Sequence, residues 1–187
     1  MTAVDTTELL RLARVESAYR REAEQLDANR LADWYNWLHD DFRYEVPIPV
    51  TYGATGEAGY SERGVLAAET KPTIALWVDR LSEELIGSAY AENPPVRTRR
   101  FVTNVRVEPC GDDVLRVASN ILLSWNQRGE PPVFATAERR DVLVDGGDGL
   151  LLRERRVLLD SDVVHLGHLR SSSDLSRCSR TKRGRRR

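Results

Sequence analysis

The stretch FVTNVRVEPCGDDVLRVASNILLSW at residues 101–125 decides the fold class. On both sides of the turn residues 111–113, every second position is mostly apolar and the positions between are mostly polar. This period of two is typical of β-strands, whose successive side chains point to opposite faces. The stretch therefore predicts two antiparallel strands joined by a short turn. The alternating positions are Phe101, Thr103, Val105 and Val107, then Leu115, Val117, Ser119, Ile121, Leu123 and Trp125.

Further strands are predicted on both sides of this stretch. Residues 133–144 and 150–166 give two more, and the sequence DGGDG at 145–149 between them is typical of a hairpin turn. Upstream, residues 42–46 alternate in the same way, and Pro47 and Pro49 either end that strand or confine it to a sheet edge. Four glycines within 51–64 predict a surface loop.

About three helices precede most of these strands. Asp5 and Glu8 form a capping-box-like pair that begins the first helix, and a short second helix follows at residues 31–38. A third is predicted from Thr70 to Ser82. Helices followed by strands indicate an α+β fold, with helices packed on one face of a curved antiparallel sheet. The apolar stripes are Leu9, Leu12, Tyr19, Ala23 and Leu26; Leu31, Trp34 and Leu38; and Ile74, Trp77, Val78 and Leu81.

The chain length of 187 residues fits one domain, which we expect at residues 1–170. Residues 171–187 begin with three serines and end in an arginine-rich run that cannot bury apolar surface, so they predict a disordered basic tail. Residues 177–187 hold seven of the 28 basic residues, which leaves 21 basic against 29 acidic residues in the body. An acidic body argues against nucleic-acid binding, because phosphate recognition needs a basic surface.

Cysteine content and hydropathy predict a reduced, cytoplasmic protein. There are two cysteines, Cys110 and Cys178, and the second lies in the basic tail, so a structural disulfide is not expected. The first residues show neither a basic nor an apolar segment typical of a signal peptide. No apolar run approaches the ~20 residues that span a bilayer, so no membrane association is expected.

Three groups of residues could carry chemistry. His165 and His168 could join a carboxylate in an iron triad, but strand residues three apart point to opposite faces, which argues against a metal site. His39, beside two aspartates, could act as a general base, but such a cluster more often lies at a solvated helix end. Aromatic residues could line a cavity or form core. The candidate cavity residues are Trp34, Tyr35, His39 and Tyr44.

Arginines concentrate in the predicted sheet. Arginine is enriched in subunit interfaces, where its planar guanidinium can pair with carboxylates. The alternative is a solvated sheet edge, where single ion pairs contribute little. The candidate interface residues are Arg97, Arg99, Arg100, Arg139 and Arg155.

Taken in order, several stretches resemble the β (small) subunits of aromatic-ring-hydroxylating dioxygenases over about residues 10–170. Each stretch is weak by itself, and the ordered set is specific. The stretches are EQLD at 24–27, RLADW at 30–34 with Trp37 and Leu38, DFRYEVP at 41–47, AENPPVRTRR at 91–100, TNV at 103–105, SN at 119–120, ERRDVL at 138–143 and RRVLLD at 155–160.

The resemblance implies a cone-shaped fold like nuclear transport factor 2 and scytalone dehydratase, with a strongly bent sheet. It also implies an α3β3 hexamer in which the large (α) subunit holds a Rieske [2Fe–2S] cluster and a mononuclear iron, and in which this chain is structural. No catalytic, cofactor-binding or metal-binding residue is then expected here. Independently, neither cysteine has a histidine two or three residues away, whereas a Rieske cluster needs paired cysteine and histidine ligands.

A second hypothesis is a stand-alone dehydratase, isomerase or cyclase of the same fold, working by acid–base chemistry inside the cone. Fold alone does not choose between the two, because functional sites are grafted onto folds. The interior of the cone discriminates between them. An enzyme needs facing acid–base groups in a pocket, whereas a structural subunit can have its interior filled.

Overall fold

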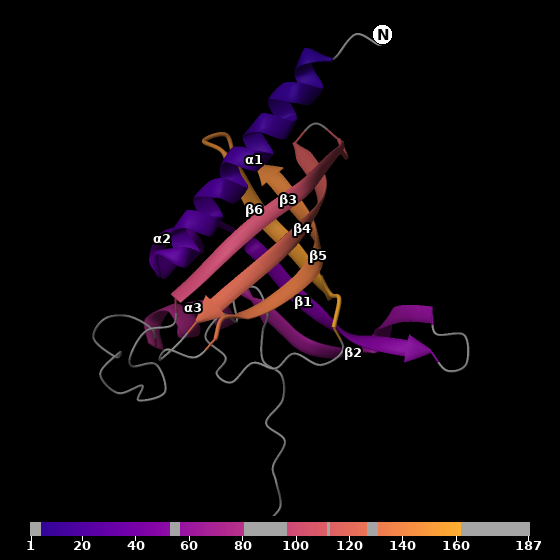
Figure 1. Cartoon of the computed structure of the whole chain (residues 1–187). Helices are drawn as coiled ribbons and strands as arrows, with labels where there is room; N and C mark the ends of the chain where they lie inside the picture. The colour runs from indigo at the N-terminus through magenta and orange to yellow at the C-terminus, as the bar shows by residue number, and fades with distance from the viewer. Residues whose placement is uncertain (1–4, 53–56, 81–96, 112, 127–130, 162–187) are drawn as a thin grey trace, which may run out of the picture.

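A computed structural model describes residues 5–52, 57–80, 97–111, 113–126 and 131–161. Within them, α1 packs against the curved sheet alongside β3, which confirms the α+β class (Figure 1). The single six-stranded sheet has the order β2-β1-β6-β5-β4-β3. The elements are α1 (Thr6–Asp27), α2 (Leu31–Asn36), β1 (Leu38–Tyr52), β2 (Glu57–Thr70), α3 (Lys71–Arg80), β3 (Arg97–Pro109), β4 (Val114–Asn126), β5 (Val133–Asp145) and β6 (Leu150–Leu159).

The sheet is mixed, whereas the sequence predicted an antiparallel one. β1 pairs with β6 in parallel, and the other four strand pairings are antiparallel. The two parallel strands are far apart in the sequence, and their pairing joins β1 and β2 to the later strands of the sheet. Neither strand's own periodicity distinguishes a parallel neighbour from an antiparallel one, so the prediction was wrong at this pairing.

The prolines of β1 do not end the strand. β1 continues through Pro47 and Pro49 to Tyr52, with register shifts against β2 at both prolines. Its pairing with β6 ends at Glu45, so among the described residues β2 is the one strand that pairs with β1 at the prolines. This is the sheet-edge alternative, because a proline at an edge removes no ladder hydrogen bond from a second neighbour.

The predicted loop at residues 51–64 is in part a strand. β2 begins at Glu57 and includes Gly59 and Gly64. A Cβ atom at Gly64 would lie 2.8 Å from Cδ1 of Ile48 on the neighbouring strand, so this glycine permits a close approach of β1 and β2. At Gly64, therefore, the glycine is explained by close packing of two strands and not by a loop.

The buried face of α1 differs from the predicted one at several positions, of which Glu22 is the most important. Val15, Tyr19, Glu22 and Leu26 are buried, at spacings of four, three and four, whereas Leu9 is 52% exposed. Asp5 caps the helix as predicted, with its Oδ1 accepting a hydrogen bond from the Thr7 backbone N–H at 2.9 Å. A glutamate thus lies in the middle of the core-facing stripe.

The hairpin between β5 and β6 forms as predicted. The Gly146 N–H donates to the Gly149 carbonyl at 2.8 Å, and Gly147 has φ +86°, a conformation that side chains with a Cβ rarely adopt. On β4, the predicted inward positions Val117, Ser119, Ile121, Leu123 and Trp125 are all buried.

Several predictions fall outside the described residues. These are the basic tail at 171–187, the candidate metal ligands His165 and His168, the second cysteine Cys178, and the end of the third predicted helix. The described part of that helix begins at Lys71 and buries Ile74 as expected.

Candidate functional site

Four charged side chains meet inside the fold, between α1 and the sheet. Glu22 comes from α1, Arg139 and Asp141 from β5, and Arg155 from β6, and each is at most 2% exposed. Arg139 and Asp141 are two residues apart on one strand, so both point inward, and Asp141 lies opposite Arg155 in the strand register. We call these four residues the ion cluster. Two carboxylates and two guanidinium groups make its formal charge zero.

The ion cluster is held together by charge-assisted hydrogen bonds. Arg155 forms a bidentate ion pair with Asp141: its Nε donates to Oδ1 at 3.0 Å and its Nη2 donates to Oδ2 at 2.8 Å. The same Nη2 donates to Oε2 of Glu22 at 3.0 Å, and Nη1 of Arg139 donates to that oxygen at 3.2 Å. Arg155 is therefore the bridge between the two carboxylates, and bidentate pairs of this kind are among the stronger polar interactions in proteins.

Aromatic side chains surround the ion cluster and add to its bonds. The Tyr19 hydroxyl donates to Oδ2 of Asp141 at 2.8 Å, and Nε1 of Trp34 donates to Oε1 of Glu22 at 3.2 Å. The Arg139 guanidinium lies 4.7 Å from the centre of the Tyr19 ring, within reach of a cation–π interaction. The carboxylates thus accept from neutral donors as well as from arginines.

Burial and neighbouring charges shift the pKa of Arg155 in the ion cluster and of Tyr19 beside it. Burial raises the pKa of Tyr19 well above its ordinary value, and the Asp141 carboxylate raises it further, although both arginines oppose this. Burial alone would lower the pKa of Arg155, but Asp141 and Glu22 raise it well above the usual range. A general acid or base works best when it titrates near the operating pH. Tyr19 and Arg155 therefore keep their protons, as a phenol and a guanidinium.

A second buried ion pair joins the end of α1 to β3. Oδ1 of Asp27 pairs with Nη1 of Arg100 at 2.6 Å, and its Oδ2 accepts from the Arg100 backbone N–H at 3.0 Å. The Thr98 hydroxyl also donates to Asp27, at 3.2 Å. The two charged side chains are 6% and 3% exposed. This ion pair holds the C-terminal end of α1 against β3, the last strand in the sheet order.

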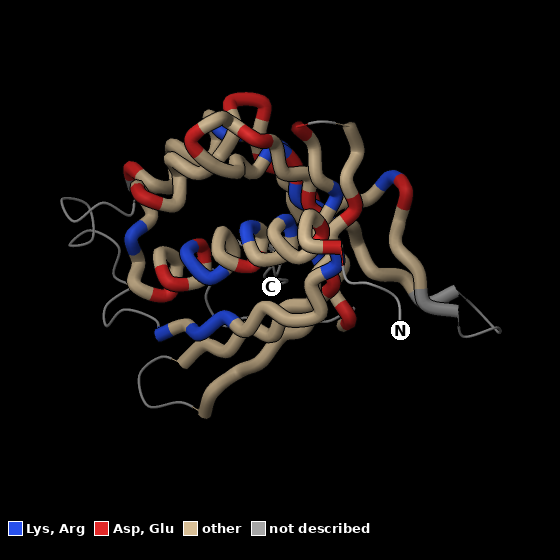
Figure 2. The backbone as a smooth tube through the Cα atoms, turned by 90° about the horizontal axis from the view of Figure 1, so that it is seen from above, with Lys and Arg blue, Asp and Glu red and all other residues tan. Residues whose placement is uncertain are grey.

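The described residues contain no cluster of three or more histidine, cysteine, aspartate or glutamate side chains placed to hold a metal ion. Within the same residues, no helix is long and apolar enough to cross a membrane. The lysines and arginines are interspersed with the acidic residues along the described backbone, rather than gathered on one face (Figure 2).

Comparison with known families decides the assignment. The family model described as ring hydroxylating beta subunit matches residues 21–166. The chain belongs to this family. The ion cluster, the Asp27–Arg100 pair and all six strands lie in the matched region.

Curated relatives of this beta subunit agree with the assignment. It is 26% identical over 154 residues to the biphenyl 2,3-dioxygenase subunit beta of Rhodococcus jostii strain RHA1, covering 80% of this chain and 82% of the relative. It is 29% identical over 152 residues to the N,N-dimethyl phenylurea N-demethylase subunit beta of a Sphingobium species, covering 76% and 81%.

Solved structures confirm the fold. A naphthalene 1,2-dioxygenase with indole in its active site contains a chain similar to this beta subunit, with a TM-score of 0.70, 21% identity and coverage of 88% and 85%. The cone-shaped ActVI-ORFA of Streptomyces coelicolor gives a TM-score of 0.54 at 20% identity, covering 79% and 96%. The predicted cone-shaped fold is thereby confirmed.

The structure places the five predicted interface arginines in two environments. Arg100, Arg139 and Arg155 are buried inside this beta subunit and are paired with its own carboxylates. The reasoning from arginine density did not identify Glu22, Asp27 and Asp141 as their internal partners. Arg97 and Arg99 are exposed on β3, and an interface role of the five arginines stays a prediction.

The four candidate cavity residues lie in different environments. Trp34 contacts the ion cluster through Glu22, and Tyr44 is buried in the core. Tyr35 lies under the Lys71 ammonium, 5.4 Å from the centre of its ring, and Nδ1 of His39 accepts from the Asp41 backbone N–H at 3.1 Å. The residues that do converge in the interior include Tyr19, Glu22 and Asp141, which the sequence reasoning missed as site residues.

Replacing Tyr19 with phenylalanine tests the coupling between the ion cluster and its aromatic neighbours. We expect a loss of about 1–2 kcal/mol in the free energy of unfolding, because one hydrogen bond to the buried Asp141 is removed. The folded-state pKa of Tyr19 is raised, so its stabilising effect is fully present below the unfolded pKa of about 10 and declines as pH rises above it. Urea titrations of both proteins from pH 7 to 11 should therefore show a difference that shrinks at alkaline pH; a constant difference would contradict the raised pKa.

Proposed function

We propose that this chain is the structural, non-catalytic small subunit of a Rieske-type aromatic-ring-hydroxylating dioxygenase. The observation that supports it best is the buried ion cluster: the two interior carboxylates, Glu22 and Asp141, are paired with arginines, whereas an acid–base enzyme of this fold would need such groups for catalysis. The family match gives the complex to which such a subunit belongs.

The chemistry is proposed to lie on a large (α) subunit. That chain would carry the Rieske [2Fe–2S] cluster and the mononuclear iron, and would add both atoms of dioxygen to an arene to give a cis-dihydrodiol. Electrons would come from NAD(P)H through a reductase, often with a ferredoxin. The proposed assembly is α3β3, with contacts to both the large subunit and sister β subunits.

The named relatives favour a structural role over a catalytic one. A beta subunit of a biphenyl dioxygenase and a beta subunit of a phenylurea N-demethylase are about equally similar to this chain. The names describe a ring dioxygenation and a demethylation, so similarity of the beta subunit does not follow the reaction type. This is expected if the beta subunit supports the assembly and another chain performs the reaction.

A stand-alone dehydratase, isomerase or cyclase remains the competing class, and the ion cluster disfavours it. Each of the two carboxylates in the ion cluster forms an ion pair with at least one arginine. A carboxylate in this position could accept a substrate proton only after its arginine moved away, which would leave a buried charge unpaired.

Coexpression with a Rieske large subunit encoded in a neighbouring reading frame tests the proposal. We expect the two chains to copurify in equal amounts with iron bound to the large subunit, and we expect the isolated small chain to bind no iron and to show no turnover. Iron analysis and arene oxidation assays on each chain and on the complex provide the measurement. Stoichiometric iron on the isolated chain, or turnover of a small molecule by it, would overturn the proposal.

A further inference from the structure

The hairpin turn between β5 and β6 contains both Asp–Gly steps of the sequence, Asp145–Gly146 and Asp148–Gly149. An aspartate followed by glycine is prone to rearrange without an enzyme, because the backbone nitrogen of the next residue can attack the aspartate carboxyl group. Glycine has no Cβ atom to hinder that attack. The two steps have the same local chemistry, so any difference between them comes from the fold.

The fold restrains the carboxylate of Asp145. Its Oδ2 accepts a hydrogen bond from Nη2 of Arg14 at 2.7 Å, and its Oδ1 accepts one from the Gly147 backbone N–H at 3.2 Å. These two bonds, the Arg14 bond first, lower the pKa of Asp145 below its ordinary value. Cyclisation needs the protonated carboxyl group, because the departing oxygen leaves as water. Asp145 is therefore held in the wrong position and in the unreactive ionised form.

The nitrogen that would attack Asp145 is restrained as well. The Gly146 N–H donates to the Gly149 carbonyl at 2.8 Å, and an amide in such a bond gives up its proton less readily. The space around Gly146 is also narrow. A Cβ atom there would lie 3.1 Å from Cδ1 of Leu151 and 3.3 Å from the Gly149 carbonyl oxygen. Both reacting groups of the first step are thus fixed by the turn.

Neither restraint applies to the second step. Asp148 is exposed, and among the described residues its carboxylate has no recorded hydrogen bond or ion pair. The same holds for the Gly149 N–H within the described part of the turn. Gly149 has φ +151°, and a Cβ atom on it would meet nothing within 4 Å. Water and backbone rotation therefore have free access at Asp148–Gly149.

We propose that Asp148 is a site of spontaneous isoaspartate formation in the folded chain, and that the same turn protects Asp145. The Gly149 nitrogen attacks Cγ of Asp148: a C–N bond forms and a C–O bond breaks. The carboxyl oxygen leaves as water, with the carboxyl proton and the amide proton. Water then opens the succinimide ring, and attack at its α-carbonyl leaves the chain running through the former side-chain carbonyl. Water is lost once and gained once, so the mass is unchanged.

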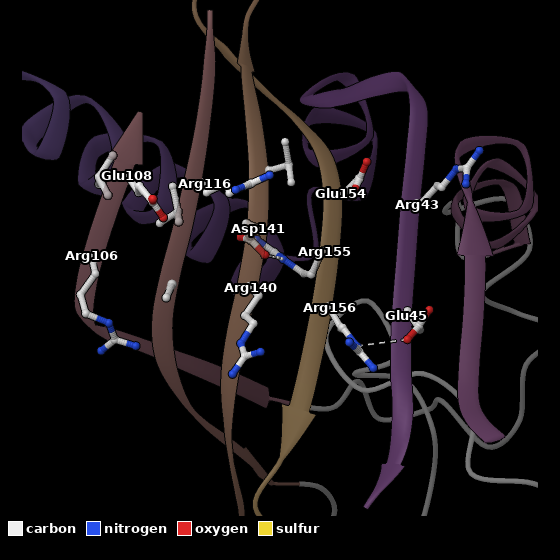
Figure 3. Close-up of a pocket in the computed structure, with 14 residues that line it drawn as sticks. Arg43, Glu45, Arg106, Glu108, Arg116, Arg140, Asp141, Glu154, Arg155 and Arg156 are labelled. Carbon is white, nitrogen blue, oxygen red and sulfur yellow. Dashed lines mark hydrogen bonds and ion pairs between the residues drawn. The ribbon is translucent and has the colours of Figure 1, made fainter. Parts of the chain in front are cut away.

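The product changes the turn and spares the core. Isoaspartate adds one atom to the backbone at position 148 and moves a carboxylate onto the chain's α-carbon. The ion cluster lies further along the two strands, where Asp141 and Arg155 are in register (Figure 3). The altered residue stays at the exposed end of the hairpin. It is then a substrate for enzymes that methylate the free α-carboxylate of isoaspartate.

Ageing of the purified full-length chain tests the proposal. One tryptic peptide, residues 141–153, contains both steps, and electron-transfer fragmentation of it distinguishes isoaspartate at each position. In the folded chain we expect isoaspartate to accumulate several-fold faster at position 148 than at position 145. In urea the contacts of the turn are lost, so the two rates should become similar. Labelling with an isoaspartate methyltransferase gives an independent measure of the total.

Two variants serve as controls. Arg14→Gln removes an exposed ion pair, which costs little stability, and should raise the rate at Asp145 while leaving Asp148 unchanged. Asp148→Glu should abolish the signal at that position, because attack would have to form a larger ring. Equal rates at the two positions of the folded chain would overturn the inference. So would the absence of isoaspartate at position 148 in the folded chain under conditions in which the unfolded chain forms it.

Discussion

Replacing Arg155 with methionine is expected to lower the free energy of unfolding of this beta subunit by about 3–5 kcal/mol, because the change leaves buried charge unpaired. Arg155 bridges Glu22 and Asp141 and is 2% exposed. Without it, Arg139 would be the one remaining cation of the ion cluster against two carboxylates. A typical domain has only about 5–15 kcal/mol of stability in total, so the effect should be obvious in urea denaturation of the purified chain.

Arg156 provides the matched control for Arg155. It is the next residue of β6, it points to the opposite face, and it pairs with Glu45 at 3.1 Å with both side chains almost half exposed. Its replacement by methionine should cost less than about 1 kcal/mol, because exposed ion pairs contribute little. Equal losses for the two variants would mean that burial of the ion cluster has no energetic consequence.

A double variant separates lost charge balance from lost packing. Combining Arg155→Met with Asp141→Leu restores a neutral interior, since Glu22 and Arg139 remain as one pair. Replacing a buried ion pair by apolar groups is often neutral or stabilising. The double variant should therefore be more stable than the single one, with part of the gain offset by the Tyr19 hydroxyl, which loses its acceptor. A double variant less stable than the single would show that packing dominates.

The second large effect is expected at Asp27. Its replacement by alanine should cost about 3 kcal/mol, because the buried carboxylate that pairs with the Arg100 guanidinium at 2.6 Å is lost, together with its bond to the Arg100 backbone N–H. α1 should then separate from β3 more readily. Hydrogen exchange of the backbone amides in the last turn of α1 and in β3 should speed up before global unfolding is reached.

Glu24 is the control for Asp27. It lies one turn earlier on α1 and pairs with Arg30 at 2.8 Å, but the two side chains are 69% and 47% exposed. Its replacement by alanine should change the stability by less than about 1 kcal/mol and leave exchange in β3 unaltered. If Glu24→Ala and Asp27→Ala had the same effect, the contact with β3 would not be what makes Asp27 important.

Much of the fold is predictable from sequence because its causes are local. Alternation with a period of two identified β3 and β4, and the DGGDG turn identified the hairpin between β5 and β6, since glycine adopts the required backbone conformation without strain. Asp5 identified the start of α1. The order of the matching stretches gave the family resemblance, which the family model over residues 21–166 confirms.

The candidate site was only partly predictable. One local feature could have revealed Glu22: it lies three residues after Tyr19 and four before Leu26, so the apolar face of α1 has a carboxylate at its centre. A charge in that position is costly unless a partner meets it there. The sequence of β5 places Arg139 and Asp141 on the inward face in the same way. The sequence of one element, however, does not show which charged residue on another element pairs with it.

The sequence by itself determined the α+β class, the family and most of the elements, because these depend on the order and spacing of neighbouring residues. It missed β2, whose glycines suggested a loop. The tertiary structure alone decided the parallel pairing of β1 with β6, the register that sets Asp141 opposite Arg155, and the meeting of both with Glu22. Each of these contacts joins residues on different elements, and burial changes their energetics. The same arginine contributes little on a surface and several kcal/mol in the core, so only the folded arrangement separates Arg155 from Arg156.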